Sequence, residues 1–471
     1  MNNYELVILG QGSAAFAAAI KADELGVQTA MVGGSATRGA TIGGTCVNVG
    51  CIPSKNLITV GNAFHEQARS SFRAIEYGRT KLDFERAIAE KDALVRKFRK
   101  EKYADVLRGL HNVEYVAERG CFVSGNEVKA GDKTLRAKKF LIATGAKAKV
   151  VPVKGTEGVD YLTNEEALSL KELPESMVVV GGRALGLEFA QMYSHFGTKV
   201  TILQRSERIL PEHEPEISCA LRGYLQDEGI DIQTRVSLKE VAQRGETRIV
   251  RCTVNGHEKE FRADQLLFAS GRAPNTDYLD AQKAGVELDA EGFVKVNEEM
   301  QTSAAHVWAA GDVIGEPMLE TVAAKEGAVA VNNAFGNGKK RIDFDEGPRA
   351  VFTTPEAASV GLTDAEANGK GIRCACGVLP LDLVPKAHII GDTRGLIKLV
   401  ADSKTKRVVG LHILAPHAAD LIHEGVLAVK FKLTIVDIID TVHVFPTLSE
   451  AIKLAAQSFY KDVGKLSCCT E

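Results

Sequence analysis

Two cysteines, Cys46 and Cys51, are the residues best suited to chemistry. They lie five positions apart behind a glycine pair, and the amphipathic run 52–64 predicts a helix directly after them. Because a helix N-terminus stabilises negative charge, a thiol placed there has a lowered pKa and forms a thiolate more readily. A spacing of five brings two sulfurs together only if the first turn is irregular, which Gly50 permits. We predict a redox-active dithiol; the alternative is a pair of buried structural cysteines.

A second cysteine pair, Cys468 and Cys469, lies next to the C-terminus. Termini are usually exposed, so this pair is a poor core element. Because soft thiolates select soft metal ions, we predict that the tail binds a metal ion; the alternative is an incidental, oxidisable tail. Cys374 and Cys376 could form a metal-binding pair, but a C-x-C spacing alone is weak evidence for one. The two cysteines are therefore read as structural. The isolated cysteines are expected in the core: Cys121, Cys219 and Cys252.

The N-terminal stretch has the pattern of a dinucleotide-binding unit. An apolar strand, 6–9, runs into a turn that contains Gly10, Gly12 and Ala15, and a helix and a second strand follow. In such a βαβ unit the glycines let backbone N–H groups approach a pyrophosphate. An acidic residue normally ends the second strand and binds a ribose, but glycines occupy that place here. We therefore expect the ribose contact from the backbone or from the loop 35–41.

A second dinucleotide unit follows strand 177–180. Its turn contains Gly181, Gly182 and Gly186, with Arg183 in place of the middle glycine of the fingerprint. This arginine is expected both to crowd a pyrophosphate and to supply a cation to it.

The end of the next strand in this unit reads Gln204, Arg205, Ser206, Glu207, Arg208. NAD sites use a carboxylate here to bind the 2′-hydroxyl, whereas NADP sites lose the carboxylate and gain arginines for the 2′-phosphate. Arg205 and Arg208 therefore predict NADPH. The alternative is two arginines on a surface loop.

Composition limits the remaining possibilities. A chain of 471 residues has room for about three domains, and a net charge of −3 argues against nucleic acid or an anionic membrane as a partner. Nine cysteines are too few for a disulfide scaffold. The N-terminus lacks the features of a signal peptide, and no apolar stretch is long enough for a membrane span. A soluble, cytoplasmic protein is expected.

The order of these motifs resembles that of the flavoprotein disulfide reductases, the FAD-dependent pyridine nucleotide-disulfide oxidoreductases. This resemblance implies an α/β fold with two Rossmann-like domains, for FAD and NADPH, and an α+β dimerisation domain at the C-terminus. The implied boundaries are an FAD-binding domain in two parts, an NADPH-binding domain between them and a dimerisation domain with the terminal cysteines: 1–150 and 276–344, 151–275, and 345–471.

The same resemblance implies roles for individual residues. Lys55 and Glu188 would pair beside the flavin, Cys51 would lie nearer the flavin, and Cys46 would be more accessible. Asp312, which follows a glycine at a strand end, is placed to bind a ribityl or ribose hydroxyl. The other residues expected to line the cofactors are Gly44, Thr45, Gly120, Thr144, Gly145, Gly271 and Glu320. Relatives often have a tyrosine that gates the nicotinamide at the position of Ala184.

The segment 443–450 bears on the substrate. Disulfide-reducing relatives have a histidine, oriented by a glutamate, that protonates the leaving thiolate; here Phe445 stands in its place and Glu450 is kept. Phenylalanine cannot transfer a proton, so efficient reduction of glutathione or lipoamide disulfide is not expected. His443 shares a face with Phe445 if the segment is extended; it is read as structural, with proton donation as the alternative.

Two thiol pairs and no proton-donating histidine resemble the mercuric reductase family. That likeness implies FAD and NADPH as cofactors and Hg(II) as the substrate, bound by Cys46 and Cys51. Cys468 and Cys469 of the partner subunit would deliver the ion, so the active protein would be a homodimer. The family often has an N-terminal metal-binding domain, which is not expected here. Two alternatives stay open: a disulfide reductase with an atypical substrate, and a flavoprotein that binds metal without turnover.

Overall fold

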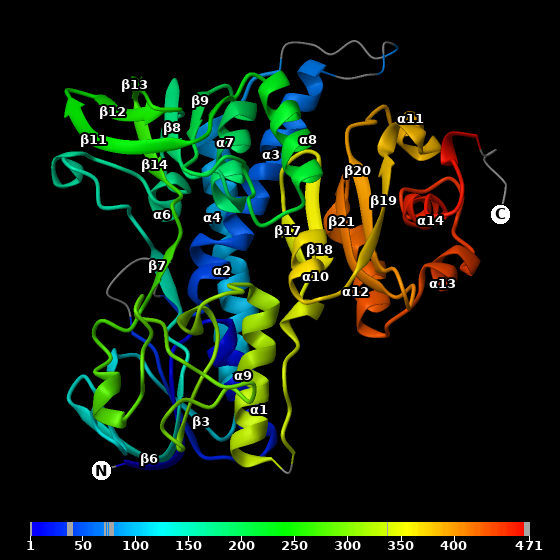
Figure 1. Ribbon diagram of the computed structural model, residues 1–471. Helices are drawn as coiled ribbons and strands as arrows, with labels where there is room; N and C mark the ends of the chain where they lie inside the picture. The colour runs from blue at the N-terminus through cyan, green and yellow to red at the C-terminus, as the bar shows by residue number, and fades with distance from the viewer. Residues whose placement is uncertain are drawn as a thin grey trace.

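The computed structural model describes residues 2–34, 41–69, 72, 74, 80–336 and 338–465 (Figure 1). The N-terminal part is built on a seven-stranded sheet in the order β3-β2-β1-β6-β5-β4, with β16 also paired to β6. Parallel pairing joins β3, β2, β1, β6 and β16. Its strands are β1 (Asn2–Leu9), β2 (Thr29–Val32), β3 (Val113–Val116), β4 (Gly120–Ser124), β5 (Glu127–Ala130), β6 (Lys133–Ile142) and β16 (Val307–Ala309).

Two helices, α1 (Ser13–Glu24) and α9 (Glu320–Phe335), lie side by side against this sheet (Figure 1). Small residues allow the close approach: a Cβ at Gly327 would lie 2.1 Å from the Ala14 carbonyl oxygen. Since β16 and α9 come late in the chain, this sheet and its helical cover combine two segments that are far apart in the sequence.

The second nucleotide unit has a parallel sheet in the order β10-β9-β8-β14. A three-stranded antiparallel sheet, β11-β12-β13, is inserted between β10 and β14 and was not predicted from the sequence. The elements are β8 (Ser176–Val180), α7 (Ala184–Phe196), β9 (Lys199–Leu203), α8 (Pro215–Asp227), β10 (Asp231–Gln233), β11 (Val236–Arg244), β12 (Thr247–Val254), β13 (His257–Ala263) and β14 (Gln265–Phe268).

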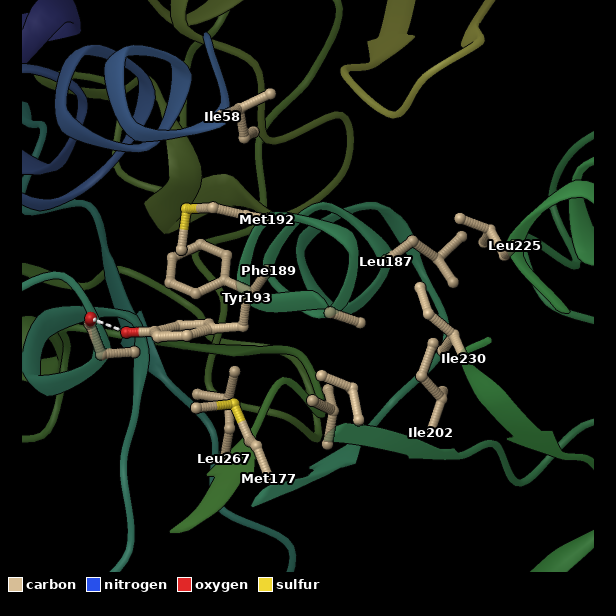
Figure 2. Close-up of a cluster of buried hydrophobic side chains, with 14 of the residues drawn as sticks. Ile58, Met177, Leu187, Phe189, Met192, Tyr193, Ile202, Leu225, Ile230 and Leu267 are labelled. Carbon is tan, nitrogen blue, oxygen red and sulfur yellow. Dashed lines mark hydrogen bonds between the residues drawn. The ribbon is translucent and has the colours of Figure 1, made fainter. Parts of the chain in front are cut away.

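Helix α7 is buried on two sides. Figure 2 shows it between strand residues such as Met177 and Leu267 on one side and Ile58 of α3 (Cys51–Arg69) on the other. The Tyr193 hydroxyl donates a hydrogen bond to the Ala167 carbonyl, so the one polar atom of this large side chain is satisfied inside the core. Helix α7 therefore fastens the second nucleotide unit to the helix that begins with Cys51.

The charged region 64–110 contains separate helices. Helix α3 ends at Arg69, and α4 (Phe84–Arg99) begins after Asp83, whose carboxylate accepts the Arg86 backbone N–H at 3.0 Å. An aspartate at this position satisfies a free N–H of the first turn and marks a helix start.

The C-terminal part is a five-stranded antiparallel sheet in the order β17-β18-β21-β20-β19, with helices on it. Its elements include β17 (Arg349–Val351), β18 (Glu356–Gly361), α10 (Asp364–Gly369), β19 (Cys374–Pro380), β20 (Leu396–Asp402), β21 (Val408–Ala415), α12 (Ala418–Lys430), α13 (Ile435–Asp440) and α14 (Glu450–Gln457). Among the described residues, no helix has the length and apolar character that crossing a membrane requires.

Candidate redox-active site

Cys46 and Cys51 meet at the junction of two helices. Cys46 lies in α2 (Gly44–Val49), and Cys51 is the first residue of α3. Gly50 breaks the helix between them, with φ −126° and ψ −117°. A Cβ there would lie 2.9 Å from the Thr45 carbonyl oxygen, so the close approach requires glycine. The irregular turn that the spacing demanded is thus present.

The two thiols have opposite electrostatic environments. The pKa of Cys51 is lowered, chiefly by a hydrogen bond from Cys46 and to a smaller extent by the positive charge of Lys55. Burial and the charge of Glu320 act in the opposite direction. The same hydrogen bond and burial raise the pKa of Cys46 strongly. Cys51 is therefore the thiol that ionises first. In the chain itself Cys51 is exposed and Cys46 half-buried; the predicted order of access concerns the flavin-bound protein and stays a prediction.

Lys55 and Glu188 form an ion pair across two helices. The Lys55 ammonium lies 2.6 Å from Glu188 Oε2, and Glu188 Oε1 accepts the Phe352 backbone N–H at 3.0 Å. Lys55 Nζ also lies 4.6 Å from the centre of the Phe352 ring. Since Lys55 follows Cys51 by one helical turn, the pair fixes a positive charge beside the dithiol. The sequence alone did not predict the Phe352 contact.

The first glycine turn brings three backbone segments into contact. A Cβ at Gly10 would lie 2.0 Å from the Ala143 carbonyl oxygen, and a Cβ at Gly44 would lie 2.6 Å from the Gly12 Cα. Gly12 caps α1 without any side-chain hydrogen bond, and Ala15 is fully buried behind it. Backbone N–H groups at such a helix start can bind a pyrophosphate.

An unsatisfied polar atom lies in the neighbouring turn. Thr144 Oγ1 is buried without a hydrogen-bond partner among the described residues, and Gly145 follows with φ +69°. A buried hydroxyl normally has a partner. The open backbone at the α1 N-terminus and the free Thr144 hydroxyl together fit the pyrophosphate and polar groups of a dinucleotide.

The glycines at the end of β2 have a structural reason. A Cβ at Gly33 would lie 2.6 Å from Gln11 Oε1, which accepts the Tyr115 hydroxyl at 2.6 Å. That hydroxyl also lies 2.7 Å from the Gly33 carbonyl oxygen. The glycine at position 33 thus leaves room for the Gln11 side chain, where related sites have an acidic residue that binds the ribose. Most of the loop expected to contact the ribose, residues 35–40, lies outside the described residues.

Arg272 joins several of the predicted cofactor residues and was not itself predicted. Its Nε lies 3.2 Å from Asp312 Oδ2, and its Nη2 donates to Thr45 Oγ1 at 3.4 Å. Glu320 begins α9 and acts electrostatically on both thiols of the dithiol. The sequence signal that could have identified Arg272 is its place directly after Gly271.

Two predicted cofactor glycines differ in their surroundings. A Cβ at Gly271, at φ +113°, would have nothing within 4 Å. Gly120 is packed in the core, where a Cβ would lie 2.6 Å from Leu9 Cδ2 and 3.0 Å from Val32 Cγ1. Close packing by itself explains the glycine at position 120.

The second glycine turn is as tight as the first. A Cβ at Gly186 would lie 2.0 Å from the Gly181 carbonyl oxygen. Arg183 caps α7 with φ −95° and ψ −175°, close to the conformation of Gly12 at α1. Its side chain is 61% exposed and lies 3.6 Å from Glu212. The Arg183 side chain extends into solvent, and its expected effects on a pyrophosphate stay a prediction.

The loop after β9 has one well-exposed arginine. Gln204 is buried, and its Oε1 accepts the Gly182 backbone N–H at 2.9 Å. Arg208 donates to the Pro211 carbonyl at 3.1 Å, which holds it against the loop. Arg205 is exposed and has no hydrogen bond or ion pair within the part of the chain that the structure describes. Arg205 is thus better placed than Arg208 to bind a phosphate.

In the segment before α14, His443 makes no hydrogen bond to Glu450 within the described chain. His443 is held between the Thr441 carbonyl, 2.9 Å from Nδ1, and Glu424 Oε1, 3.0 Å from Nε2. Glu450 Oε2 is buried without a hydrogen-bond partner in the described chain, and burial raises the pKa of this carboxyl. Phe445 is 49% exposed. The arrangement agrees with a structural His443 and with the loss of a base at position 445.

Other predictions about cysteines have mixed outcomes. Cys252 is buried as expected, but Cys219 is exposed and Cys121 is only half-buried. The expectation for Cys219 was wrong because α8 buries the face of Ile217, Leu221 and Leu225, and position 219 lies off it. The terminal pair, Cys468 and Cys469, lies outside the described residues.

Several large apolar side chains are exposed on the C-terminal domain. They belong to α12, to the turn after it and to the segment before α14: Leu427, Phe431, Val442, Val444 and Phe445. Large apolar side chains left exposed in this number on one domain are typical of a protein interface.

Comparisons with known proteins agree with this architecture. Residues 4–327 match the pyridine nucleotide-disulphide oxidoreductase family, and residues 347–456 match the dimerisation domain of that family. Mercuric reductase of Lysinibacillus sphaericus is 42% identical over 99% of this chain and 85% of its own length. Mercuric reductase of Streptomyces lividans is 39% identical, over 99% and 98%. Dihydrolipoyl dehydrogenase of Thermus scotoductus is 35% identical, over 98% of both chains.

Among solved structures, the Cu(II) complex of the HOCl-induced flavoprotein disulfide reductase RclA from Escherichia coli is similar throughout. It has a TM-score of 0.87 and 28% sequence identity, and the match covers 98% of this chain and 100% of that one.

Proposed function

This chain belongs to the pyridine nucleotide-disulphide oxidoreductase family, and we propose that it is an NADPH-dependent flavoenzyme that reduces Hg(II) to Hg(0). The observation that supports this most is the pair of adjacent thiols, Cys46 and Cys51, combined with Phe445 where a disulfide reductase needs an acid. Mercuric reductases at 35–42% identity over nearly the whole chain support the same substrate.

Two cofactors fit the glycine turns. The turn of Gly10 and Gly12, with Gly44 and Thr144, would bind FAD; the turn of Gly181 and Gly186, with Arg205 on the 2′-phosphate, would bind NADPH. Bound FAD would supply the electron relay between NADPH and the thiols. Lys55 would act on the thiol end of this relay. Held by Glu188, it keeps a positive charge beside Cys51 and favours the Cys51 thiolate.

Hg(II) is a soft ion, which two thiolates bind well. Cys46 and Cys51 would each lose a proton and bind the ion together. One NADPH supplies two electrons, so that NADPH and Hg(II) give NADP⁺, a proton and Hg(0). Phe445 and the other apolar residues near the C-terminal segment transfer no proton, and this reaction needs none at the metal.

The protein would act as a homodimer with a site shared between subunits. The dimerisation domain match and the exposed apolar residues of the C-terminal domain support a dimer. Cys468 and Cys469 of one subunit would pass Hg(II) by thiol exchange to the Cys46 and Cys51 pair of the other. We place the enzyme in the cytoplasm, where thiols are kept reduced.

The test is NADPH oxidation by the purified protein with Hg(II) in an excess of small thiol. The parent is compared with a Cys468→Ala/Cys469→Ala variant. The matched control is Cys219→Ala, which removes an exposed cysteine that has no assigned role in the reaction. Turnover that requires Hg(II), falls in the tail variant and is kept in the control supports both the reaction and the delivery step. Absence of Hg(II)-dependent turnover in the parent contradicts the proposal.

A disulfide reductase with an unusual substrate is the second candidate, since one relative is a dihydrolipoyl dehydrogenase. That function predicts turnover with a disulfide, and no effect of removing the tail cysteines. A third outcome, stoichiometric Hg(II) uptake without NADPH oxidation, would indicate a flavoprotein that only sequesters the metal.

A further inference from the structure

A third group of thiols lies far along the chain from the dithiol. Cys374 and Cys376 are two residues apart on β19, an edge strand of the C-terminal sheet. Alternate residues of a strand face the same side, so both sulfurs face α10. The ligand atoms of Asp364, Cys374 and Cys376 all lie within 4.8 Å of one another. We propose that these three residues form a further metal site, specific for a thiophilic d¹⁰ divalent ion.

The ligands are held in place before any metal binds. Asp364 Oδ1 is 2.8 Å from Cys374 Sγ and also accepts the Asn368 side-chain N–H at 2.7 Å. The Asp364 backbone N–H donates to Glu214 Oε1 at 2.7 Å. Asp364 is thus held in place through both its carboxylate and its backbone N–H, which lowers the entropy cost of ordering the carboxylate around an ion.

Access and charge suit a cation. Cys376 is exposed, whereas Cys374 is half-buried, so an ion can enter from the Cys376 side. In the described part of the chain, Lys398 is the cation that acts most strongly on Cys376, and it is paired with Glu214 at 2.9 Å and with Glu216 at 2.9 Å. Together with Asp364, these carboxylates leave the surroundings negative.

The ligand set decides the class of ion. Two sulfurs and one carboxylate are typical of Zn(II), Cd(II) or Hg(II), whereas Mg(II) and Ca(II) need oxygen ligands. On binding, the two S–H bonds break, two metal–sulfur bonds form, and two protons pass to solvent; no electron moves. A disulfide is less suitable, because residues i and i+2 of a strand have Cα atoms about 6.7 Å apart, at the upper limit for that bond.

Cd(II) tests the site without being consumed by turnover. The starting protein is the reduced, FAD-loaded full chain in which the other two thiol pairs are changed to serine: Cys46, Cys51, Cys468 and Cys469. Equilibrium dialysis against Cd(II) gives the stoichiometry, and the ultraviolet thiolate-to-cadmium absorption reports sulfur ligation. We expect one Cd(II) per chain, lost in Cys374→Ser/Cys376→Ser and bound at least about tenfold more weakly in Asp364→Asn.

Matched variants separate the site from a folding defect. Cys219→Ser removes an exposed cysteine elsewhere and should keep the ion, and Cys376→Ser alone changes only the exposed ligand and should lose it. FAD content is measured for each variant. No Cd(II) in the starting protein, or Cd(II) that persists after Cys374→Ser/Cys376→Ser, overturns the proposal; unchanged affinity in Asp364→Asn overturns the three-ligand set. These results are independent of Hg(II) reduction at the dithiol.

Discussion

Replacing Glu228 by glutamine tests how the domains are held around the dithiol. Glu228 follows α8, and its carboxylate is almost fully buried. It lies 2.8 Å from Gln191 Nε2 and 3.1 Å from His195 Nε2, both on α7, and accepts from Arg394 at 2.8 Å. Arg394 belongs to the C-terminal domain. One carboxylate therefore joins the second nucleotide unit to the dimerisation domain.

The contribution of Glu228 to the free energy of unfolding follows from the pKa of its carboxyl group. Burial by itself raises the pKa of Glu228, but hydrogen bonds from His195, Gln191 and Arg394 outweigh it and lower the pKa from 4.5 to about 2. Such a difference between the folded and unfolded states corresponds to about 3 kcal/mol of stability. Because the folded pKa is the lower one, this stability is fully present above pH 4.5 and is lost as the pH falls toward 2.

Glu228→Gln should therefore lower the free energy of unfolding by about 3 kcal/mol at pH 7. Urea unfolding of the FAD-loaded protein, followed by far-ultraviolet circular dichroism, measures the difference. The parent and the variant should differ most at pH 7 and approach each other at pH 3. Glu90→Gln, which removes an exposed carboxylate paired with Arg86 on α4, is the control and should change little.

Two results would refute this reasoning. If Glu228→Gln unfolds at the same urea concentration as the parent at pH 7, the carboxylate contributes nothing through its three partners. If the difference between the two proteins is the same at pH 3 and pH 7, the stability does not come from a carboxyl group with a lowered pKa.

Three further predictions concern the redox site and its cofactors. Lys55→Met should raise the pKa of Cys51, because the ammonium is one of the groups that lower it; the pH profile of Cys51 alkylation in the reduced, FAD-free chain should move to higher pH. Gly44→Ala should reduce the FAD bound by the purified protein, because a Cβ there, at φ +65°, would lie 2.6 Å from the α1 N-cap backbone. Gly125→Ala, with nothing within 4 Å, is its control, and equal flavin-to-protein absorbance in the two variants would contradict the prediction. Arg205→Ala should raise KM for NADPH about tenfold and leave KM for NADH unchanged in steady-state assays; a parallel rise for both would contradict a 2′-phosphate contact.

Local patterns in the sequence predicted the nucleotide-binding units well. The predicted strands 6–9 and 177–180 end at the same residues as β1 (Asn2–Leu9) and β8 (Ser176–Val180). These elements are contiguous, and their glycine turns have a required backbone shape that can be read from residue types. The break at Gly50 was predicted for the same reason, since two sulfurs five residues apart cannot meet on a regular helix.

Contacts between distant segments could not be predicted in this way. The glycine at position 33 is explained by Gln11 and Tyr115, which come from other elements of the sheet. Arg272 reaches Thr45 across more than two hundred residues of sequence. The sequence offered only a weak C-x-C signal for Cys374, because the third ligand, Asp364, precedes it by ten residues on a separate helix.

The pairing of α3 with α7 explains why these distant contacts matter for the chemistry. Helix α3 begins with Cys51 and has Lys55 one turn later; α7 begins at the second glycine turn and has Glu188 one turn later. The two helices are joined at one end by Lys55 and Glu188 and farther along by Asn62, whose Oδ1 lies 2.9 Å from His195 Nδ1. The position of the dithiol relative to the second glycine turn is thus fixed by one helix pair. Since Glu228 holds the far end of α7, its replacement should disturb the Lys55 ion pair as well as stability.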